Sequence, residues 1–418
     1  MTTTAPAASA LIHAPTPASL DWPRGFRASV GAAAIKKPGR DDLALLAMPS
    51  GATAAAIFTR NLFAAAPIEV SRRNLKDSRG HASALVLNSG CANAATGPRG
   101  VANAVETVDA IARGLGCAPE AVLVNSTGVI GVQLPMDRIL PVLPGMAAAI
   151  PGAADGGPLE PFARAIMTTD TKPKMSARAI DCGGGRTVRV AGVAKGAGMI
   201  RPDMATMISV LATDAEVDAR TLDRILRHAA DASYHRISVD GDTSTNDSVF
   251  AFASGLAGPC DEAVLARAFR EVACELARMI VCDGEGFERS LAVRVTGAAS
   301  RADALKVAET VASSLLVRTA VTGGDPNWGR IVAAAGRAGV AFRANDLELR
   351  VGGILIFRDG QPVEADKGAV RAAFNGSHVA VELSLGATEG AAAELNSDEF
   401  LSCGLTTEYV RLNADYTT

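Results

Sequence analysis

Short runs in which apolar and polar residues alternate recur along the chain and predict β-strands. In the run 290–296, the apolar residues Leu291, Val293 and Val295 fall on one face. Arg294 falls on the other face, which is the pattern of a strand that buries one side. Runs of the same kind predict strands at 83–88, 121–125, 187–193, 248–253, 349–357 and 379–385.

Between these runs, apolar residues recur with the period of a helix. The clearest stretch is 261–280, where Asp261 is the predicted N-cap because its carboxylate can accept hydrogen bonds from the first backbone amides. Its apolar stripe consists of Val264, Leu265, Ala268, Phe269, Val272, Leu276 and Met279. Further helices are predicted at 101–113, 218–232 and 302–317. Helices and strands are interleaved, which predicts a mixed α/β fold built in layers.

Clusters of turn-forming residues at 144–161 and 283–289 are the candidate domain boundaries, and we place the division at the second. The predicted organisation is a loose N-terminal tail at 1–20, a large domain at 21–288 and a smaller domain at 289–418. The tail lacks the basic start and the apolar core of a secretory signal.

Composition narrows the classes of protein. Hydrophobic residues make up 48% and charged residues 20% of the 418 residues, as in an ordinary folded protein. A net charge of −3 without a basic block argues against nucleic acid or an anionic membrane as a partner. No run reaches the roughly 18 apolar residues that span a bilayer. The seven cysteines form no CxxC pair and predict buried thiols in a reducing compartment, so we expect a cytoplasmic protein. With nucleic acid and anionic membranes disfavoured as partners, we expect the protein to act on small molecules.

The most informative segment is 195–207, KGAGMIRPDMATM, which leads into the apolar run 208–211. Its glycines permit backbone angles closed to other residues, and Pro202 fixes a bend. The peptide between Ala205 and Thr206 is therefore a candidate for strain, and strain before a hydroxyl residue favours self-cleavage. The alternative is an ordinary loop before a strand.

In such a cleavage, the Thr206 hydroxyl attacks the carbonyl carbon of Ala205, the acyl bond moves from nitrogen to oxygen, and water hydrolyses the ester. The product is a new N-terminal threonine. Its α-amine has an ordinary pKa of about 7.7 to 8.0, so an unprotonated fraction can act as the base for its own hydroxyl. Residue chemistry alone thus predicts an acyltransferase or amidohydrolase with an N-terminal nucleophile.

At this segment the sequence resembles the ArgJ family of ornithine acetyltransferases (glutamate N-acetyltransferases), with Thr206 at the position of the nucleophile. The resemblance extends from about residue 31 to 418 through unusual strings in the expected order. They are NSGCANAATG at 88–97, NSTGVIG at 125–131, TTDTKPK at 168–174, SVDGDTSTND at 238–247, DGEG at 283–286, GDPNWGRI at 324–331 and YVRLNADYTT at 409–418.

The resemblance implies a layered α-β-β-α sandwich of the self-processing N-terminal-nucleophile type, as in DmpA and ArgJ proteins. It also implies a smaller C-terminal α/β domain, with a tail that returns to the active site. The implied mature chains are 1–205 (α) and 206–418 (β), two of each forming a heterotetramer. The implied reaction moves acetyl from N2-acetyl-L-ornithine to L-glutamate through acetyl-Thr206, in the cyclic pathway of arginine biosynthesis.

Thr127 and Gly128 match the oxyanion hole of the family, and they are expected in a Ser-Thr-Gly turn after a strand. A hydroxyl and a backbone amide there would stabilise the negative charge on a tetrahedral intermediate. The residues that match substrate contacts are Thr169, Lys195, Thr206, Glu285, Asn413 and Thr418.

The types of these residues suit an amino-acid substrate, because Lys195 offers a positive charge to a carboxylate and Glu285 a negative charge to an amine. Without the resemblance, Thr169 and Lys195 would be a turn residue and a surface charge, and 406–418 would be a frayed end. One departure from the family pattern is Phe287-Glu288, where smaller residues are expected.

The acidic string 238–247 invites comparison with an EF-hand loop, but Thr245 stands where such a loop needs glycine and Ala251 where it needs glutamate. We expect no metal and no cofactor, with acetyl-CoA left open as a second acetyl donor. Four residues of the string are expected to brace the surroundings of the nucleophile by hydrogen bonds, namely Asp240, Asp242, Asn246 and Asp247.

Two other functions remain open. A self-processed aminopeptidase or amidohydrolase would use the same nucleophile but pass the acyl group to water. The second is an amino-acid-binding protein without catalysis, against which the presence of Thr206, Thr127 and Lys195 argues.

Overall fold

A computed structural model describes residues 20–150, 156–181, 186–201 and 207–415. Within these ranges the chain divides into two units. The large unit consists of 20–235 and 242–280, and the small unit consists of 236–241 and the residues from 281 onward. Three residues expected in the active site, Ala205, Thr206 and Thr418, lie outside the described residues.

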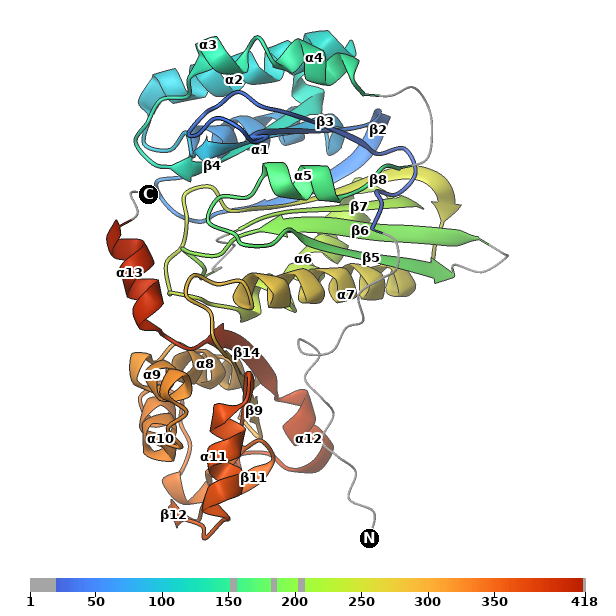
Figure 1. Ribbon diagram of the computed structural model, residues 1–418. Helices are drawn as coiled ribbons and strands as arrows, with labels where there is room; N and C mark the ends of the chain where they lie inside the picture. Colours follow the sequence, from blue (N-terminus) through green and yellow to red (C-terminus); the bar gives the residue numbers. More distant parts are fainter. Residues whose placement is uncertain (1–19, 151–155, 182–185, 202–206, 416–418) are drawn as a thin grey trace. The chain divides into compact units, whose positions relative to one another are not determined.

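The large unit contains an eight-stranded sheet (Figure 1). Its strands are β1 (Arg27–Gly31), β2 (Leu43–Phe58), β3 (His81–Cys91), β4 (Val122–Val129), β5 (Lys174–Asp181), β6 (Thr187–Lys195), β7 (Ile208–Glu216) and β8 (Ser248–Pro259). They follow the order β4-β3-β2-β8-β7-β6-β5, with β1 paired to β2. Strand β2 joins the two halves, because its first part pairs with β3 and its last part pairs with β8.

Helices cover the outer faces of both halves. They are α1 (Ala66–Asp77), α2 (Gly97–Leu115), α3 (Met136–Ile139), α4 (Leu143–Ala148), α6 (Ala219–Asp231) and α7 (Glu262–Val281), with 3-10 turns η1 (Pro119–Ala121) and η2 (Tyr234–Arg236). The short helix α5 (Glu160–Ala165) instead lies between the two halves, where Phe162 shares a core with Leu46 (Figure 1). In β2, Leu43 and Leu45 share a core with α2, whereas Ala44 and Leu46 share a core with β8. On the other half, Ser176 of β5 donates a hydrogen bond to a carboxylate of α7.

This arrangement confirms the expected α-β-β-α layering, in which the two β layers are halves of one hydrogen-bonded sheet. Alternate residues of a strand point to opposite faces, so β2 can bury one face against helices and the other between the layers.

The small unit is built on a six-stranded sheet in the order β12-β11-β10-β13-β9-β14. Its strands are β9 (Ser290–Thr296), β10 (Glu348–Val351), β11 (Ile354–Arg358), β12 (Gln361–Pro362), β13 (His378–Ser384) and β14 (Asp398–Cys403). Its helices are α8 (Arg301–Ala312), α9 (Leu315–Gly323), α10 (Trp328–Gly336), α11 (Lys367–Asn375), α12 (Gly390–Leu395) and α13 (Thr407–Asp415), with a 3-10 turn η3 (Ala344–Asp346). Leu291, Val293 and Val295 of β9 are buried in its core, which confirms the predicted alternation.

The helix predicted at 261–280 is α7, and its predicted cap is confirmed. The Asp261 carboxylate accepts hydrogen bonds from the amides of Ala263 (2.9 Å) and Val264 (3.1 Å). Val264 itself is 39% exposed, so its place in the buried stripe was predicted wrongly. In the first turn of a helix, a residue can lie at the edge of the buried stripe and remain in contact with solvent.

Two predicted elements are each divided in two. The predicted strand 349–357 is a hairpin of β10 and β11, because Gly352 and Gly353 adopt left-handed φ angles of 57° and 79° and turn the chain. The predicted helix 302–317 is α8 followed by α9, with a break at Ser313 and Ser314. Ser314 leaves the helical region with an extended backbone (φ −67°, ψ 119°) and takes the N-cap position of α9.

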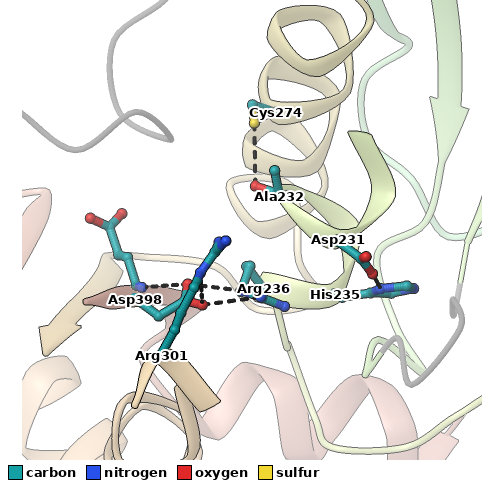
Figure 2. Close-up of polar contacts among 8 residues, drawn as sticks. Asp231, Ala232, His235, Arg236, Cys274, Arg301 and Asp398 are labelled. Carbon is teal, nitrogen blue, oxygen red and sulfur yellow. Dashed lines mark hydrogen bonds and ion pairs between the residues drawn. The ribbon is translucent and has the colours of Figure 1, made fainter. Parts of the chain in front are cut away.

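Segment 236–241 belongs to the small unit, although its neighbours in sequence on both sides belong to the large one. Figure 2 shows how its first residue is held, with the Asp398 carboxylate between the guanidinium groups of Arg236 and Arg301. Arg236 donates two hydrogen bonds, of 2.9 and 3.0 Å. Next to it, Ile237 forms a bridge with Leu401 of β14. The start of the string SVDGDTSTND is thus attached to the sheet of the small unit.

The described cysteines are of two kinds. Free thiols are found at Cys91, Cys117, Cys274, Cys282 and Cys403. Cys260 is in a disulfide, so the expectation of a thiol is wrong there, because spacing along the sequence does not reveal which sulfurs meet in space. In the described part of the chain, no helix combines the length and the apolar character needed to cross a membrane.

Candidate active site

The parallel pairing of β3 and β4 brings their carboxyl ends to one edge of the sheet in the large unit. Thr127 and Gly128 lie at this end of β4, paired with Ser89 and Gly90 of β3. They were expected in a turn after the strand. Instead the strand continues through them, because pairing with β3 extends to its end across a bulge at Cys91.

The backbone at Gly128 allows no side chain. Its φ is 133°, and an added Cβ atom would lie 2.3 Å from the carbonyl carbon of Gly90 and 2.5 Å from the amide nitrogen of Cys91. Glycine is therefore needed for β3 and β4 to approach each other beside Thr127. This close approach places a backbone amide and a hydroxyl on consecutive residues at the strand end, as an oxyanion hole requires.

Buried carboxamides hold the strand end that carries Thr127. The Asn246 side chain donates hydrogen bonds to the carbonyl oxygens of Ser126 (2.8 Å) and Ala92 (2.6 Å). Asn125 donates in turn to the carbonyl oxygen of Asn246 (3.0 Å). The Ser126 carbonyl and the Thr127 amide belong to one peptide group, so Asn246 fixes the plane of that peptide. Asn246 thus braces this region, as the sequence led us to expect.

The same string also holds the segment before the expected cleavage site. The Arg201 amide donates to the carbonyl oxygen of Asp242 (3.0 Å), and the Thr243 hydroxyl donates to the carbonyl oxygen of Arg201 (2.8 Å).

The segment that precedes the expected cleavage site is strained where it is described. Met199 has a φ of 56°, whereas the φ of 148° at Gly196 is one that glycine adopts without strain. The left-handed region is costly for a residue with a long side chain, so Met199 stores backbone strain three residues before 202–206, which lies outside the described residues.

Lys195 ends β6, and its ammonium group donates to the Thr127 hydroxyl at 3.2 Å. Lys195 is buried, contrary to the alternative of a solvated surface charge. In the pairing of β6 with β7, Lys195 stands opposite Ile208, two residues after Thr206 in the sequence. The structure therefore brings together two of the expected site residues, Thr127 and Lys195.

Sequence reasoning missed Asp170, whose side chain is fully buried. Burial alone would raise its pKa, but attraction to Lys174 and Lys195, with hydrogen bonds from Lys174 and the Thr168 amide, lowers the pKa to about 2. Asp170 is therefore an anion at neutral pH. In the sequence, the signal for this ion pair was the spacing of four residues between Asp170 and Lys174 within TTDTKPK. The same spacing is common in ion pairs on protein surfaces, so it does not reveal burial. The expected substrate contact Thr169 lies next to Asp170 in the chain and is half-buried.

In the small unit, two expected substrate contacts meet. Asn413 on α13 donates a hydrogen bond to the Glu285 carboxylate (2.8 Å). The start of α13 is anchored by Thr406, whose hydroxyl donates to the carbonyl oxygen of Gly286 (2.9 Å) and accepts from the amide of Tyr409 (3.1 Å). Residues 407–415 thus form a helix docked on the DGEG loop, and the alternative of a frayed end is wrong for them.

The unusual pair Phe287-Glu288 follows this loop. The Phe287 amide donates to the carbonyl oxygen of Gly284 (2.9 Å) and closes the turn. This is a backbone role open to most residues. The Phe287 side chain is half-buried, and Glu288 is exposed.

A cavity of about 890 Å³ in the large unit lies elsewhere. Its lining includes His81 and Ser83 at the start of β3, Ala121 just before β4, and Arg24 and Arg27. These positions are at the opposite ends of β3 and β4 from Thr127. None of the expected site residues in the described chain lines it, so we do not assign the reaction to this cavity.

A layered α-β-β-α unit that presents a hydroxyl, a backbone amide and a buried ammonium group at one strand end defines a class, the acyl-transferring enzymes with the N-terminal-nucleophile fold. The chain belongs to the ArgJ family, whose profile matches residues 27–418.

Individual relatives agree with this assignment. The chain is 45% identical over 399 residues to the arginine biosynthesis bifunctional protein ArgJ of Nitratidesulfovibrio vulgaris, with 94% of this chain and 98% of that protein covered. It is 44% identical over 405 residues to the protein of the same name from Gloeobacter violaceus, with 94% and 97% covered.

Solved structures of relatives match part of the chain. One is ArgJ of Bacillus halodurans, with 34% identity, a TM-score of 0.46, and 49% of this chain and 96% of that chain covered. Another is the ornithine acetyltransferase of Mycobacterium tuberculosis complexed with ornithine, with 37% identity, a TM-score of 0.39, and coverage of 46% and 99%.

Proposed function

We propose that this enzyme moves the acetyl group of N2-acetyl-L-ornithine to L-glutamate, giving L-ornithine and N-acetyl-L-glutamate, in the cyclic pathway of arginine biosynthesis. The observation that carries the proposal is membership of the ArgJ family along residues 27–418. The buried pair of Thr127 and Lys195 supports it, because it supplies polar groups for an acyl-transfer reaction.

The proposed reaction has two halves. The Thr206 hydroxyl attacks the acetyl carbonyl of N-acetylornithine while the α-amine of Thr206 takes the hydroxyl proton. The carbon–nitrogen bond then breaks, ornithine leaves with that proton, and acetyl-Thr206 remains. In the second half, the amine of glutamate attacks this ester and gives one proton to the α-amine of Thr206. The carbon–oxygen bond of the ester then breaks, N-acetylglutamate leaves, and the Thr206 oxygen takes that proton from the α-amine.

Each remaining residue has a role in this proposal. Thr127 and Gly128 donate hydrogen bonds to the oxyanion in both halves, a contribution of about 10² to 10³ in rate for each donor. The groups that bind the substrates are Thr169, Lys195, Thr206, Glu285, Asn413 and Thr418. Lys195 suits a substrate carboxylate, and Glu285 suits the amine of ornithine.

The α-amine of Thr206 exists only after self-cleavage, so the proposal includes chains 1–205 and 206–418 and their assembly as a heterotetramer, two of each. It requires no cofactor, with acetyl-CoA as a candidate second acetyl donor. We place the enzyme in the cytoplasm, with its metabolic substrates.

The experiment that tests this proposal replaces Thr206. We expect Thr206→Ala to abolish self-cleavage and acetyl transfer together, and Thr206→Ser to retain part of both because a hydroxyl remains. Intact mass under denaturing conditions measures the cleavage, and formation of N-acetylglutamate measures the transfer. A wild-type chain that stays whole after prolonged incubation, or an alanine variant with wild-type transfer, would contradict the mechanism.

The same assay separates transfer from hydrolysis. If water is the true acceptor, free acetate will form from N-acetylornithine at a rate that glutamate does not lower. That outcome would identify an amidohydrolase with the same nucleophile.

A further inference from the structure

The buried carboxylate of Asp170 links two separate segments of the large unit. One of its oxygens accepts hydrogen bonds from the Lys174 ammonium group and from the Gly196 amide, each at 2.6 Å. Its other oxygen accepts from the Thr168 amide at 3.0 Å. The side chain has no exposed surface.

Both amides belong to immediate neighbours of proposed substrate contacts. Thr168 directly precedes Thr169, and Gly196 directly follows Lys195. One carboxylate therefore sets the separation between the two segments that present these contacts. Hydrogen bonds to an ionised acceptor are roughly twice as strong as those between neutral groups, so this is a firm link.

The ladder between β5 and β6 does not supply this link by itself. Its terminal pair is Lys174 with Ala194, and Thr169 lies in the loop before β5. Beyond that pair, strand pairing no longer fixes where the loop stands. The contacts of Asp170 with Lys174 and Gly196 continue the attachment past the end of the ladder.

Asp170 also acts on Lys195 through charge. The ammonium groups of Lys174 and Lys195 both attract its carboxylate, while Lys195 donates to the Thr127 hydroxyl. The buried carboxylate is thus part of the environment that holds a buried ammonium group beside Thr127.

We propose that Asp170 is a positioning residue for acetyl transfer, which holds Thr169 and Lys195 at the separation that the substrate requires. The proposal rests on the function proposed above, in which both residues contact the substrate. Asp170 itself touches neither substrate nor acetyl group.

The test begins with Asp170→Asn, which keeps the shape of the side chain and removes its charge. We expect the KM for N-acetylornithine and for glutamate to rise at least about tenfold, with a smaller change in kcat, because loss of positioning weakens binding in the ground state and the transition state alike. Rates are expressed per cleaved chain, as counted by denaturing mass spectrometry.

A double variant separates positioning from charge balance. Asp170→Asn removes the negative charge beside the buried Lys174 ammonium group, which lowers the melting temperature whatever the role of Asp170. Adding Lys174→Met removes that buried positive charge. If Asp170 only neutralises Lys174, the double variant will recover both its melting temperature and its KM. We expect the melting temperature to recover and the KM to remain high.

Asp214→Asn is the matched control. Asp214 is also fully buried and also accepts an amide from β6, that of Arg189 at 2.7 Å, but toward the opposite end of the strand. We expect this variant to melt at a lower temperature with an unchanged KM.

Ornithine binding, measured by calorimetry in the uncut Thr206→Ala background, repeats the comparison without catalysis or cleavage. A wild-type KM in Asp170→Asn, a restored KM in the double variant, or unchanged ornithine affinity in this background would each overturn the positioning role. Failure of the proposed function would look different, because the wild-type enzyme itself would then form no N-acetylglutamate.

Discussion

At the scale of single residues, Gly128 shows how one missing side chain lets two strands approach closely beside Thr127. Gly128→Ala would place a Cβ atom 2.3 Å from the carbonyl carbon of Gly90, so β3 and β4 must move apart where Thr127 is held. We expect kcat for acetyl transfer to fall about 10²- to 10³-fold, as when one oxyanion donor is lost.

The control for this substitution is Gly145→Ala in α4, where an added Cβ atom meets no other atom within 4 Å. Alanine favours a helix over glycine, so this variant should retain full activity and equal or slightly higher thermal stability. Steady-state kinetics on both proteins make the comparison. Full activity in Gly128→Ala would show that the reaction does not depend on the close approach of β3 and β4 at this residue.

At the scale of elements, helix α13 carries Asn413, one of the proposed substrate contacts, and lies against the DGEG loop. Deleting residues 413–418 removes the hydrogen bond from Asn413 to the Glu285 carboxylate and the proposed substrate contact of Thr418. We expect substrate affinity to fall by on the order of 2 kcal/mol, because charge-assisted contacts to the substrate are lost. Self-cleavage, measured by intact mass, should remain.

Arg411→Ala is the control within the same helix. Arg411 is exposed and pairs with Glu408 at 2.7 Å, a surface ion pair that contributes little to stability. This variant should bind N-acetylornithine as the wild type does. If the truncated protein also binds with unchanged affinity, Asn413 and Thr418 must be removed from the proposed site.

At the scale of the whole molecule, each of the two units has its own hydrophobic core. Leu291→Ala removes a fully buried side chain from β9, which lies between β13 and β14 in the sheet of the small unit, at a cost of about 3 kcal/mol. We expect faster hydrogen exchange in β9, β13 and β14 and unchanged exchange in β3 and β4. Hydrogen-exchange mass spectrometry measures both sets of peptides, and Leu45→Ala in the large unit should give the reverse pattern. Equal loss of protection in both units would show that they unfold together.

Much of the fold follows from neighbours in the sequence. The alternation of Leu291, Val293 and Val295 and the cap at Asp261 are local signals, because strand faces and helix caps depend on residues only a few positions apart. The predictions of one strand at 349–357 and one helix at 302–317 were wrong, and the signals that they overlooked are also local. The pair Gly352-Gly353 and the pair Ser313-Ser314 break the pattern at the points where the structure turns.

What the sequence by itself determined was the set of strands and helices, the family strings and the types of residue that suit acyl transfer, with Thr206 as the expected nucleophile. Only the tertiary structure decided that Lys195 is buried against Thr127, that Asp170 links the amides of Thr168 and Gly196, and that Asn246 holds the peptide before Thr127. The physical reason is that burial and hydrogen bonding between distant segments depend on how strands pair and layers pack. The identity of a lysine or an aspartate in the sequence therefore does not show whether its side chain lies in a buried hydrogen-bond network or on a solvated surface.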